Sequence, residues 1–331
     1  MRKLLAFAIV AAALWGGYWF VGSAAVERGL VAWLDARRAD GWVAEYDSLN
    51  TAGFPNRFDT TITGLTLSDP ALDVTWKAPL FQILALSYRP NHIIVALPHT
   101  QTLETRFQQV DIASTQMRGS VVFRPGTALA PDRATIVMDD LTLDGSGGWS
   151  VGLAEGRLAT RRTVALDNAH DVAFTALGLA PTAAMLATLD PDARLPKTVD
   201  TLKIDTTVTF DAPWDRFALE GDRPQITAVT LKLAQATWGA LDLRAAGQLT
   251  VDSLGVPSGR ITVTITNWRD ILGLAVAGGL VPADIARTVE RGLSLMAGMS
   301  GDPTTLEAPL SFQNGFVSFG PVPLGPAPRL R

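Results

Sequence analysis

The stretch TVDTLKIDTTVTFDAPW, residues 198–214, decides the fold class. Every second position of an extended strand points to the same face, so an alternation of apolar and polar residues indicates a strand with one buried side. β-branched and aromatic residues, which favour strands, dominate this stretch. The positions that share a face are Leu202, Ile204, Thr206, Val208 and Phe210.

Similar short runs, rich in Val, Ile, Leu and Thr, fill most of the chain on both sides of this stretch. Gly, Pro, Asn or Asp residues separate them, as expected for strands joined by turns. No helical pattern stands between successive runs, which argues against a parallel α/β sheet. We therefore predict a mainly β protein built on a long, curled, antiparallel meander.

The apolar residues return to a helical period near the end of the chain. The pattern predicts two helices, over residues 268–278 and 283–298, that pack on the sheet. The side chains expected to face the sheet are Leu272, Leu274, Val276, Ile285, Val289, Leu293 and Met296. A further short helix is predicted over residues 180–189, and Asn314-Gly315 is suited to a tight hairpin turn.

The chain begins with a long apolar run that follows Arg2 and Lys3. The run starts at Leu4, ends at Val26 and contains no charged residue. As a helix it would rise about 34 Å, enough for the ~30 Å hydrocarbon core of a bilayer. Residues 22–25 also fit a signal-peptide cleavage site, but the length of the run favours a retained anchor.

Aromatic residues cluster near the far end of this run, where their rings favour the membrane–water interface. They are Trp15, Tyr18, Trp19 and Phe20. Positive residues before the run favour a cytoplasmic N-terminus. We therefore expect a single-pass protein of the inner membrane, with the bulk of the chain in the periplasm.

Three regions follow from these patterns. Residues 1–41 form the anchor and a juxtamembrane helix that stops near Gly41, since glycine closes helices readily. Residues 42–180 form a first β region. Residues 181–331 form a second β region with the C-terminal helices and a proline-rich tail.

Composition and motifs exclude several classes of function. A net charge of −4 argues against nucleic-acid binding, and the absence of cysteine excludes disulfides and thiolate chemistry. Ser150 lies in a G-x-S-x-G pattern, but strand-like alternation follows it where a nucleophile elbow requires a helix. His92, His99 and His170 lack metal-ligand spacing. We expect no catalytic residue, no metal and no cofactor.

Several motifs resemble an uncharacterised family of alphaproteobacterial envelope proteins with an N-terminal membrane segment. They are GFPNRF at 53–58, WKAP at 76–79, SYRPNHII at 87–94 and NGFVSFGPVPLGPAP at 314–328. The motif positions singled out are Gly53, Phe54, Pro55, Arg57, Phe58, Trp76, Pro79, Pro90 and Asn91. More distantly, residues 243–268 are similar to AsmA-like proteins, whose β-sheets carry an apolar groove.

These motifs also have local interpretations. Gly53 and Pro55 are expected to form a turn that Phe54 and Phe58 pin to the sheet, and Pro90-Asn91 is expected to join two strands.

The resemblance and the lack of catalytic motifs lead to one functional hypothesis. The protein is expected to bind or pass lipid acyl chains, or another apolar envelope component, in a groove of the sheet and without catalysis. The alternative is an assembly factor of the envelope that contacts other envelope proteins. An envelope serine hydrolase using Ser150 is the third interpretation.

Overall fold

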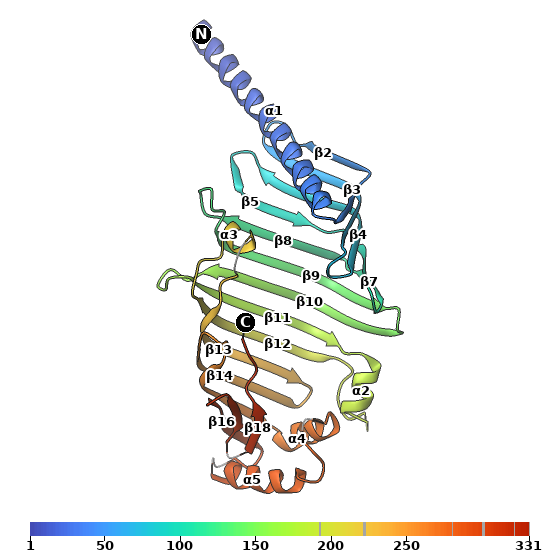
Figure 1. The fold of residues 1–331 in the computed structure, drawn as a ribbon, viewed down its shortest axis with the longest axis vertical. Helices are drawn as coiled ribbons and strands as arrows, with labels where there is room; N and C mark the ends of the chain where they lie inside the picture. Colours follow the sequence, from blue (N-terminus) through green and yellow to red (C-terminus); the bar gives the residue numbers. More distant parts are fainter. Residues whose placement is uncertain (192, 221–222, 280, 300–301, 321, 331) are drawn as a thin grey trace. The chain divides into compact units, whose positions relative to one another are not determined.

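The computed structural model describes residues 1–191, 193–220, 223–279, 281–299, 302–320 and 322–330 (Figure 1). It is mainly β, as predicted, with antiparallel strands and an N-terminal helix. Contacts group the chain into two compact units. Unit 1 comprises residues 1–125 and 136–148, and unit 2 comprises residues 126–135 and 149–331. The predicted division at residue 180 stays a prediction.

Unit 1 holds the long helix α1 (Arg2–Ala39) and a set of antiparallel strands. The strands are β1 (Val43–Glu45), β2 (Ser48–Ala52), β3 (Arg57–Asp69), β4 (Val74–Leu86), β5 (Arg89–Ala96), β6 (Thr100–Thr105), β7 (Gln109–Ala113) and β8 (Gln116–Phe123). Strand β9 (Pro131–Gly145) has residues in both units. Among the described residues, α1 alone is long and apolar enough to cross a membrane.

Strands β3 and β4 organise unit 1. β3 pairs with β1 and β2 along one edge and with β4 along the other. The first part of β4 pairs with β6 and its last part with β5, so the sheet branches at β4. Alternate residues of β3, among them Phe58, Thr60 and Ile62, are buried, as the period-two pattern requires.

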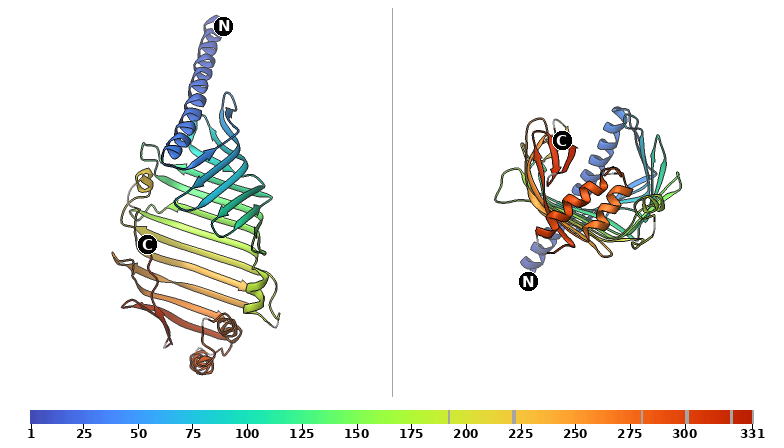
Figure 2. Two further views of the ribbon diagram at one scale, coloured as in Figure 1. Left: turned by 45° about the vertical axis from the view of Figure 1, so that its right-hand side comes forward. Right: turned by 90° about the horizontal axis from the view of Figure 1, so that it is seen from below.

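Unit 2 is a continuous meander in which each strand pairs with the next (Figure 2). Its strands are β10 (Trp149–Arg162), β11 (Ala169–Ala180), β12 (Val199–Phe210), β13 (Ile226–Trp238), β14 (Leu241–Val251), β15 (Pro257–Thr266), β16 (Thr305–Gln313), β17 (Phe316–Phe319) and β18 (Val322–Pro326). Its helices are α2 (Ala183–Leu189), α3 (Arg216–Glu220), α4 (Trp268–Ala277) and α5 (Ala286–Met299).

The best-buried core of unit 2 lies where α4 and α5 cover the sheet. Trp268 is 1% exposed and Ala297 is fully buried, and both pack against Val263 and Leu306 of the sheet. The predicted inward positions Leu272, Val289, Leu293 and Met296 belong to this cluster. Ile285 was predicted wrongly, because α5 begins one residue later and leaves its side chain 44% exposed.

Local predictions are confirmed in three places. The short helix predicted over residues 180–189 forms as α2, and Thr182 caps it by accepting a hydrogen bond from the backbone N–H of Met185 at 3.1 Å. Asn314 and Gly315 have φ angles of 53° and 76°, as a tight hairpin turn requires. α1 ends at Ala39, and Gly41 follows with φ of 89°.

Candidate functional site

The second half of α1 is built into unit 1. Trp19 is only 7% exposed, and its Nε1–H donates a hydrogen bond to the carbonyl oxygen of Arg57 at 2.6 Å. The Trp19 ring lies 5.4 Å from that of Phe54 and 6.3 Å from that of Phe58, measured between centroids. Residues 53–58, which we call the docking loop, therefore receive the helix.

Hydrogen bonds before and after Trp19 continue this contact. The indole N–H of Trp15 donates to the side-chain oxygen of Asn56 at 3.1 Å, and the hydroxyl of Tyr18 donates to the carbonyl of Ser87 at 2.6 Å. Further along the helix, a carboxylate oxygen of Glu27 accepts the backbone N–H of Thr51 at 2.6 Å. Three turns of α1 are thus fixed to β2, the docking loop and the turn after β4.

Two glycines allow the close approach of helix and loop. A Cβ at Gly22 would lie 2.5 Å from the ring of Phe58, so that any larger residue in this turn would displace the ring. Gly53 has φ of 101° and accepts backbone hydrogen bonds from Asn56 and Arg57, which close the loop. The Phe54–Pro55 peptide bond is cis.

The motif residues of the docking loop thus pack mainly against helix α1 and less against the sheet. Phe54 and Phe58 were expected to pin this loop to the sheet. Phe58 is 5% exposed and packs under α1, whereas Phe54 is 57% exposed and touches Trp19 and Phe20. Sequence reasoning missed Gly22 and Glu27, since their partners lie far along the chain.

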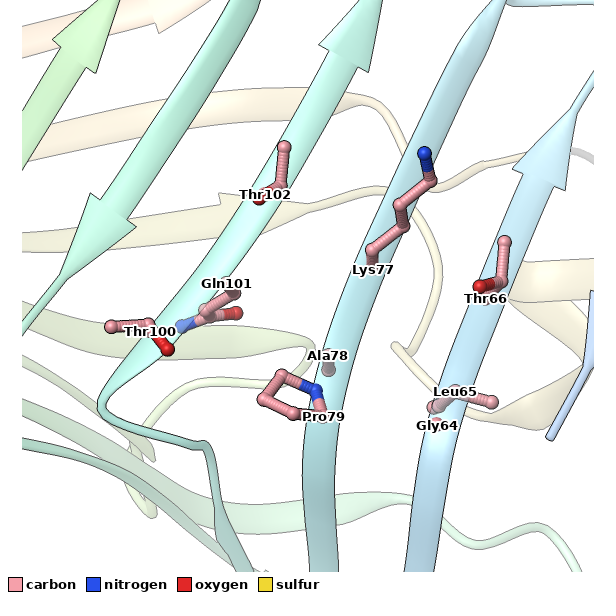
Figure 3. A pocket seen from close by; sticks show the side chains of 9 residues that line it. All are labelled: Gly64, Leu65, Thr66, Lys77, Ala78, Pro79, Thr100, Gln101 and Thr102. Carbon is pink, nitrogen blue, oxygen red and sulfur yellow. The ribbon is translucent and has the colours of Figure 1, made fainter. Parts of the chain in front are cut away.

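The second motif lies in β4, away from the docking loop. Trp76 donates its indole N–H to the side-chain oxygen of Gln101 at 2.8 Å and packs edge-on against Phe81. Pro79 stands opposite Gly64, whose φ of 61° interrupts the regular ladder. Pro79, Gln101 and Gly64 line a hollow of about 310 Å³ (Figure 3).

The third motif corrects a prediction. Pro90 and Asn91 were expected to form a turn, but both belong to β5, and the turn consists of Ser87 and Tyr88. Pro90 precedes the residues of β5 that pair with β8, so the ladder does not need its missing N–H. Asn91 donates its side-chain amide to the carbonyl of Phe123 at 2.9 Å.

One face of the unit 2 sheet is apolar across seven successive strands. Residues directly opposite each other in an antiparallel sheet share a face, so the register defines rows that cross the strands. We call one of them the apolar row: Leu158, Phe174, Ile204, Ala234, Ala245, Val263 and Ala308.

The apolar row is covered at one end only. Val263 is 8% exposed and Ala308 fully buried, because α4 and α5 pack over that part of the sheet. At the other end Leu158 is 38% exposed and Ile204 is 42% exposed, with Phe174 half-buried between them. The surface that the helices cover on β15 and β16 therefore continues uncovered onto β10–β12.

The neighbouring row, one residue along each strand, faces the opposite side and is polar throughout. It consists of Arg157, Thr175, Lys203, Gln235, Arg244, Thr264 and Glu307. Such an alternation gives the sheet one face suited to water and one suited to apolar contacts.

An ion cluster stabilises the polar face beside this row. The carboxylate of Asp171 accepts hydrogen bonds from the hydroxyl of Thr207 at 2.6 Å, from Lys232 at 2.9 Å and from Arg161 at 3.1 Å. These donors hold the pKa of Asp171 well below its usual range, and the hydroxyl of Thr207 contributes most. The same pairing raises the pKa of Lys232.

The geometry does not assemble a triad around Ser150. Ser150 stands at the start of β10, in a strand as the alternation predicted. His170 pairs with Arg162 at the other end of β10, about 40 Å away at ~3.3 Å per residue. His92 and His99 bond instead to Ser120 and to the carbonyl of Ser114. Among the described residues, no three His, Cys, Asp or Glu side chains are placed to hold a metal ion.

The chain belongs to the bacterial family described as "Uncharacterized protein conserved in bacteria (DUF2125)", whose model matches residues 19–328. The match begins at Trp19, the tryptophan of α1 that is buried against the docking loop. A search of the curated proteins gave no significant match, and neither did a search of the solved structures. The alphaproteobacterial origin and the likeness to AsmA-like proteins stay predictions.

Proposed function

We propose that this DUF2125 protein is a single-pass inner-membrane protein that holds or passes lipid acyl chains in the periplasm, without catalysing a reaction. The observation that carries the proposal is the uncovered part of the apolar row, from Leu158 to Ile204. Exposed apolar surface that continues a buried core in this way is typical of binding sites.

The uncovered surface is long enough for part of an acyl chain. Strands lie ~4.8 Å apart, so the uncovered row from β10 to β12 measures about 10 Å. Half of a ~30 Å hydrocarbon core, the depth of one leaflet, is about 15 Å, so the row would cover about two thirds of that length. Each methylene that leaves water gains about 0.8 kcal/mol, so a chain lying along the row would be held without specific polar contacts.

The docking of α1 supports an anchor that is retained. A cleaved signal would take Trp15, Tyr18 and Trp19 away from unit 1, although the protein uses all three as hydrogen-bond donors. The positive residues before the apolar run favour a cytoplasmic N-terminus, which would leave the strands of both units in the periplasm.

The test compares matched substitutions on the two faces of the same strands. Leu158→Gln with Ile204→Gln makes the apolar row polar, and Arg157→Gln with Lys203→Gln places the same side chains on the polar row. All four positions are exposed, so neither pair disturbs a buried core. Each full-length protein is purified from membranes in mild detergent and examined by native mass spectrometry and by titration with a fluorescent fatty acid.

We expect bound lipid in the unaltered protein and in the polar-row variant. The apolar-row variant should bind the fatty acid about tenfold more weakly, from roughly 1.4 kcal/mol of lost apolar contact. Equal affinities in the two variants would refute the proposal. An unaltered protein without lipid but crosslinked to envelope proteins would favour the assembly-factor alternative.

A further inference from the structure

The residues that α1 would need to cross a membrane overlap with the residues that contact the docking loop. A helix needs about 20 residues to cross the hydrocarbon core, so a span that begins at Leu4 ends near Ser23. Trp15, Tyr18 and Trp19 are already bonded to unit 1 before that point. Only residues 4–14 precede the contact, and they rise about 16 Å, roughly half of the core.

Tilting the helix does not resolve this mismatch. A tilted helix needs more residues to cross the same thickness, so tilt would place the docking loop still deeper. The loop itself lies at the level of the span, since Phe54 contacts Trp19 and Phe20 and lies against Gly16. Unit 1 therefore meets the membrane at this loop if α1 crosses it.

We propose that the docking loop and the Ser87–Tyr88 turn insert into the periplasmic leaflet of the membrane that α1 spans. The proposal rests on the anchoring part of the proposed function. The partner of the docking loop is then a lipid surface. Unit 1 would contact the bilayer through this loop and the Ser87–Tyr88 turn as well as through α1.

The exposed side chains of this region suit the lipid interface. Phe54 is 57% exposed and Tyr88 is 58% exposed, and aromatic rings favour the depth of the headgroups. Tyr88 follows Ser87, whose carbonyl binds Tyr18 of the helix, so both aromatic residues lie beside the span. Arg89 is exposed next to Tyr88 and provides positive charge for lipid phosphates, whereas the guanidinium of Arg57 pairs with the carboxylate of Asp59 at 2.9 Å.

The absence of cysteine makes the depth of single sites measurable. A cysteine is introduced in separate full-length variants by Tyr88→Cys, Phe54→Cys, Ile9→Cys or Phe107→Cys, and is labelled with an environment-sensitive fluorophore. Ile9 reports on the span. Phe107 is a matched exposed aromatic residue, 86% exposed, in the turn after β6. Because β6 ends beside Val74, at the far end of β4 from Tyr88, about 40 Å separates the two sites.

The labelled proteins are reconstituted in vesicles of phosphatidylethanolamine and phosphatidylglycerol with lipids that carry a nitroxide near the headgroup. Quenching at Tyr88 and Phe54 should exceed that at Phe107 by about twofold or more, since interfacial residues lie at the depth of the quencher. Tyr88 is the decisive site, because its replacement leaves the Trp19 cluster intact.

Two results would overturn the proposal. If Ile9 is quenched by lipids labelled deep in the chain while Tyr88 is quenched no more than Phe107, the helix spans and the loop stays outside, which refutes the inference alone. If Ile9 is not quenched either, the anchor itself is refuted and the inference falls with it.

Discussion

Substitution of Gly22 by alanine measures how tightly α1 is fixed to unit 1. The added methyl group would lie 2.5 Å from Cζ of Phe58 and 3.1 Å from Cε1, closer than carbon atoms approach each other. Phe58 is 5% exposed, so its ring has little room to move away. We expect the cost that is usual for overpacking a core, about 1–3 kcal/mol.

Alanine also stabilises a helix relative to glycine, by up to ~1 kcal/mol, and this gain has to be removed from the comparison. Gly29 provides the control, because it lies in the same helix and a Cβ there meets nothing within 4 Å. Gly22→Ala and Gly29→Ala share the gain in helix propensity. The difference between their stabilities therefore isolates the contact with Phe58.

The assay is thermal unfolding of the full-length protein in detergent, followed by near-ultraviolet circular dichroism of the tryptophans. A cost of 1–3 kcal/mol corresponds to a midpoint roughly 2–12 °C below that of the Gly29→Ala variant. Adding Phe58→Leu should recover part of the loss, because the two sites are coupled. Equal midpoints for Gly22→Ala and Gly29→Ala would show that the helix does not rest on Phe58.

Two further predictions concern carboxylates: Glu27, which binds α1 to β2, and Asp171, which binds neighbouring strands of unit 2. Glu27→Ala leaves the buried backbone N–H of Thr51 without its acceptor and should lower the free energy of unfolding by about 1–3 kcal/mol, measured by chemical denaturation. Glu27→Gln keeps a side-chain acceptor and should lower it by less. Equal losses of stability in the two variants would contradict a stabilising role for this hydrogen bond. Asp171→Asn should cost about 1–2 kcal/mol at neutral pH, because the partner Arg161 is largely exposed and Lys232 is half-exposed. Folding lowers the pKa of Asp171, so its contribution to stability is present above its unfolded pKa, about 4, and is lost progressively as the pH falls toward the lower folded pKa. The stability curves of the unaltered protein and the Asp171→Asn variant should therefore approach each other steadily below about pH 5; a gap of constant size over that range would contradict this.

The strands were predictable because their signal is local. The alternation from Leu202 to Phe210 predicts a strand that the structure places at Val199–Phe210, since period two is a property of the backbone itself. The turn at Asn314-Gly315 follows from the same kind of local preference for positive φ. The alternation also predicts that each strand has an apolar side and a polar side. Only the register of the sheet shows which residues of neighbouring strands lie side by side and so form the apolar and polar rows.

The docking of α1 was not predictable, because it depends on partners far apart in sequence. Trp19 and Arg57 are separated by 38 positions, and no period or motif links them. The aromatic residues from Trp15 to Phe20 were interpreted as an interfacial belt on composition alone. In the structure Trp19 is buried against the docking loop. The aromatic cluster therefore packs against the rest of unit 1, which the interpretation as an interfacial belt did not include.

The same contacts bear on whether the apolar run is removed. Cleavage within residues 22–25 would delete Trp19, and the loss of a buried tryptophan costs about 3–5 kcal/mol. It would also uncover Phe58, which is buried under the helix, and leave Phe54 without its two aromatic neighbours. A domain of ordinary stability, about 5–15 kcal/mol, would lose a large part of it in that step. Signal peptides are discarded without consequence for the mature fold, whereas this helix supplies part of the core of unit 1, which favours an anchor that stays.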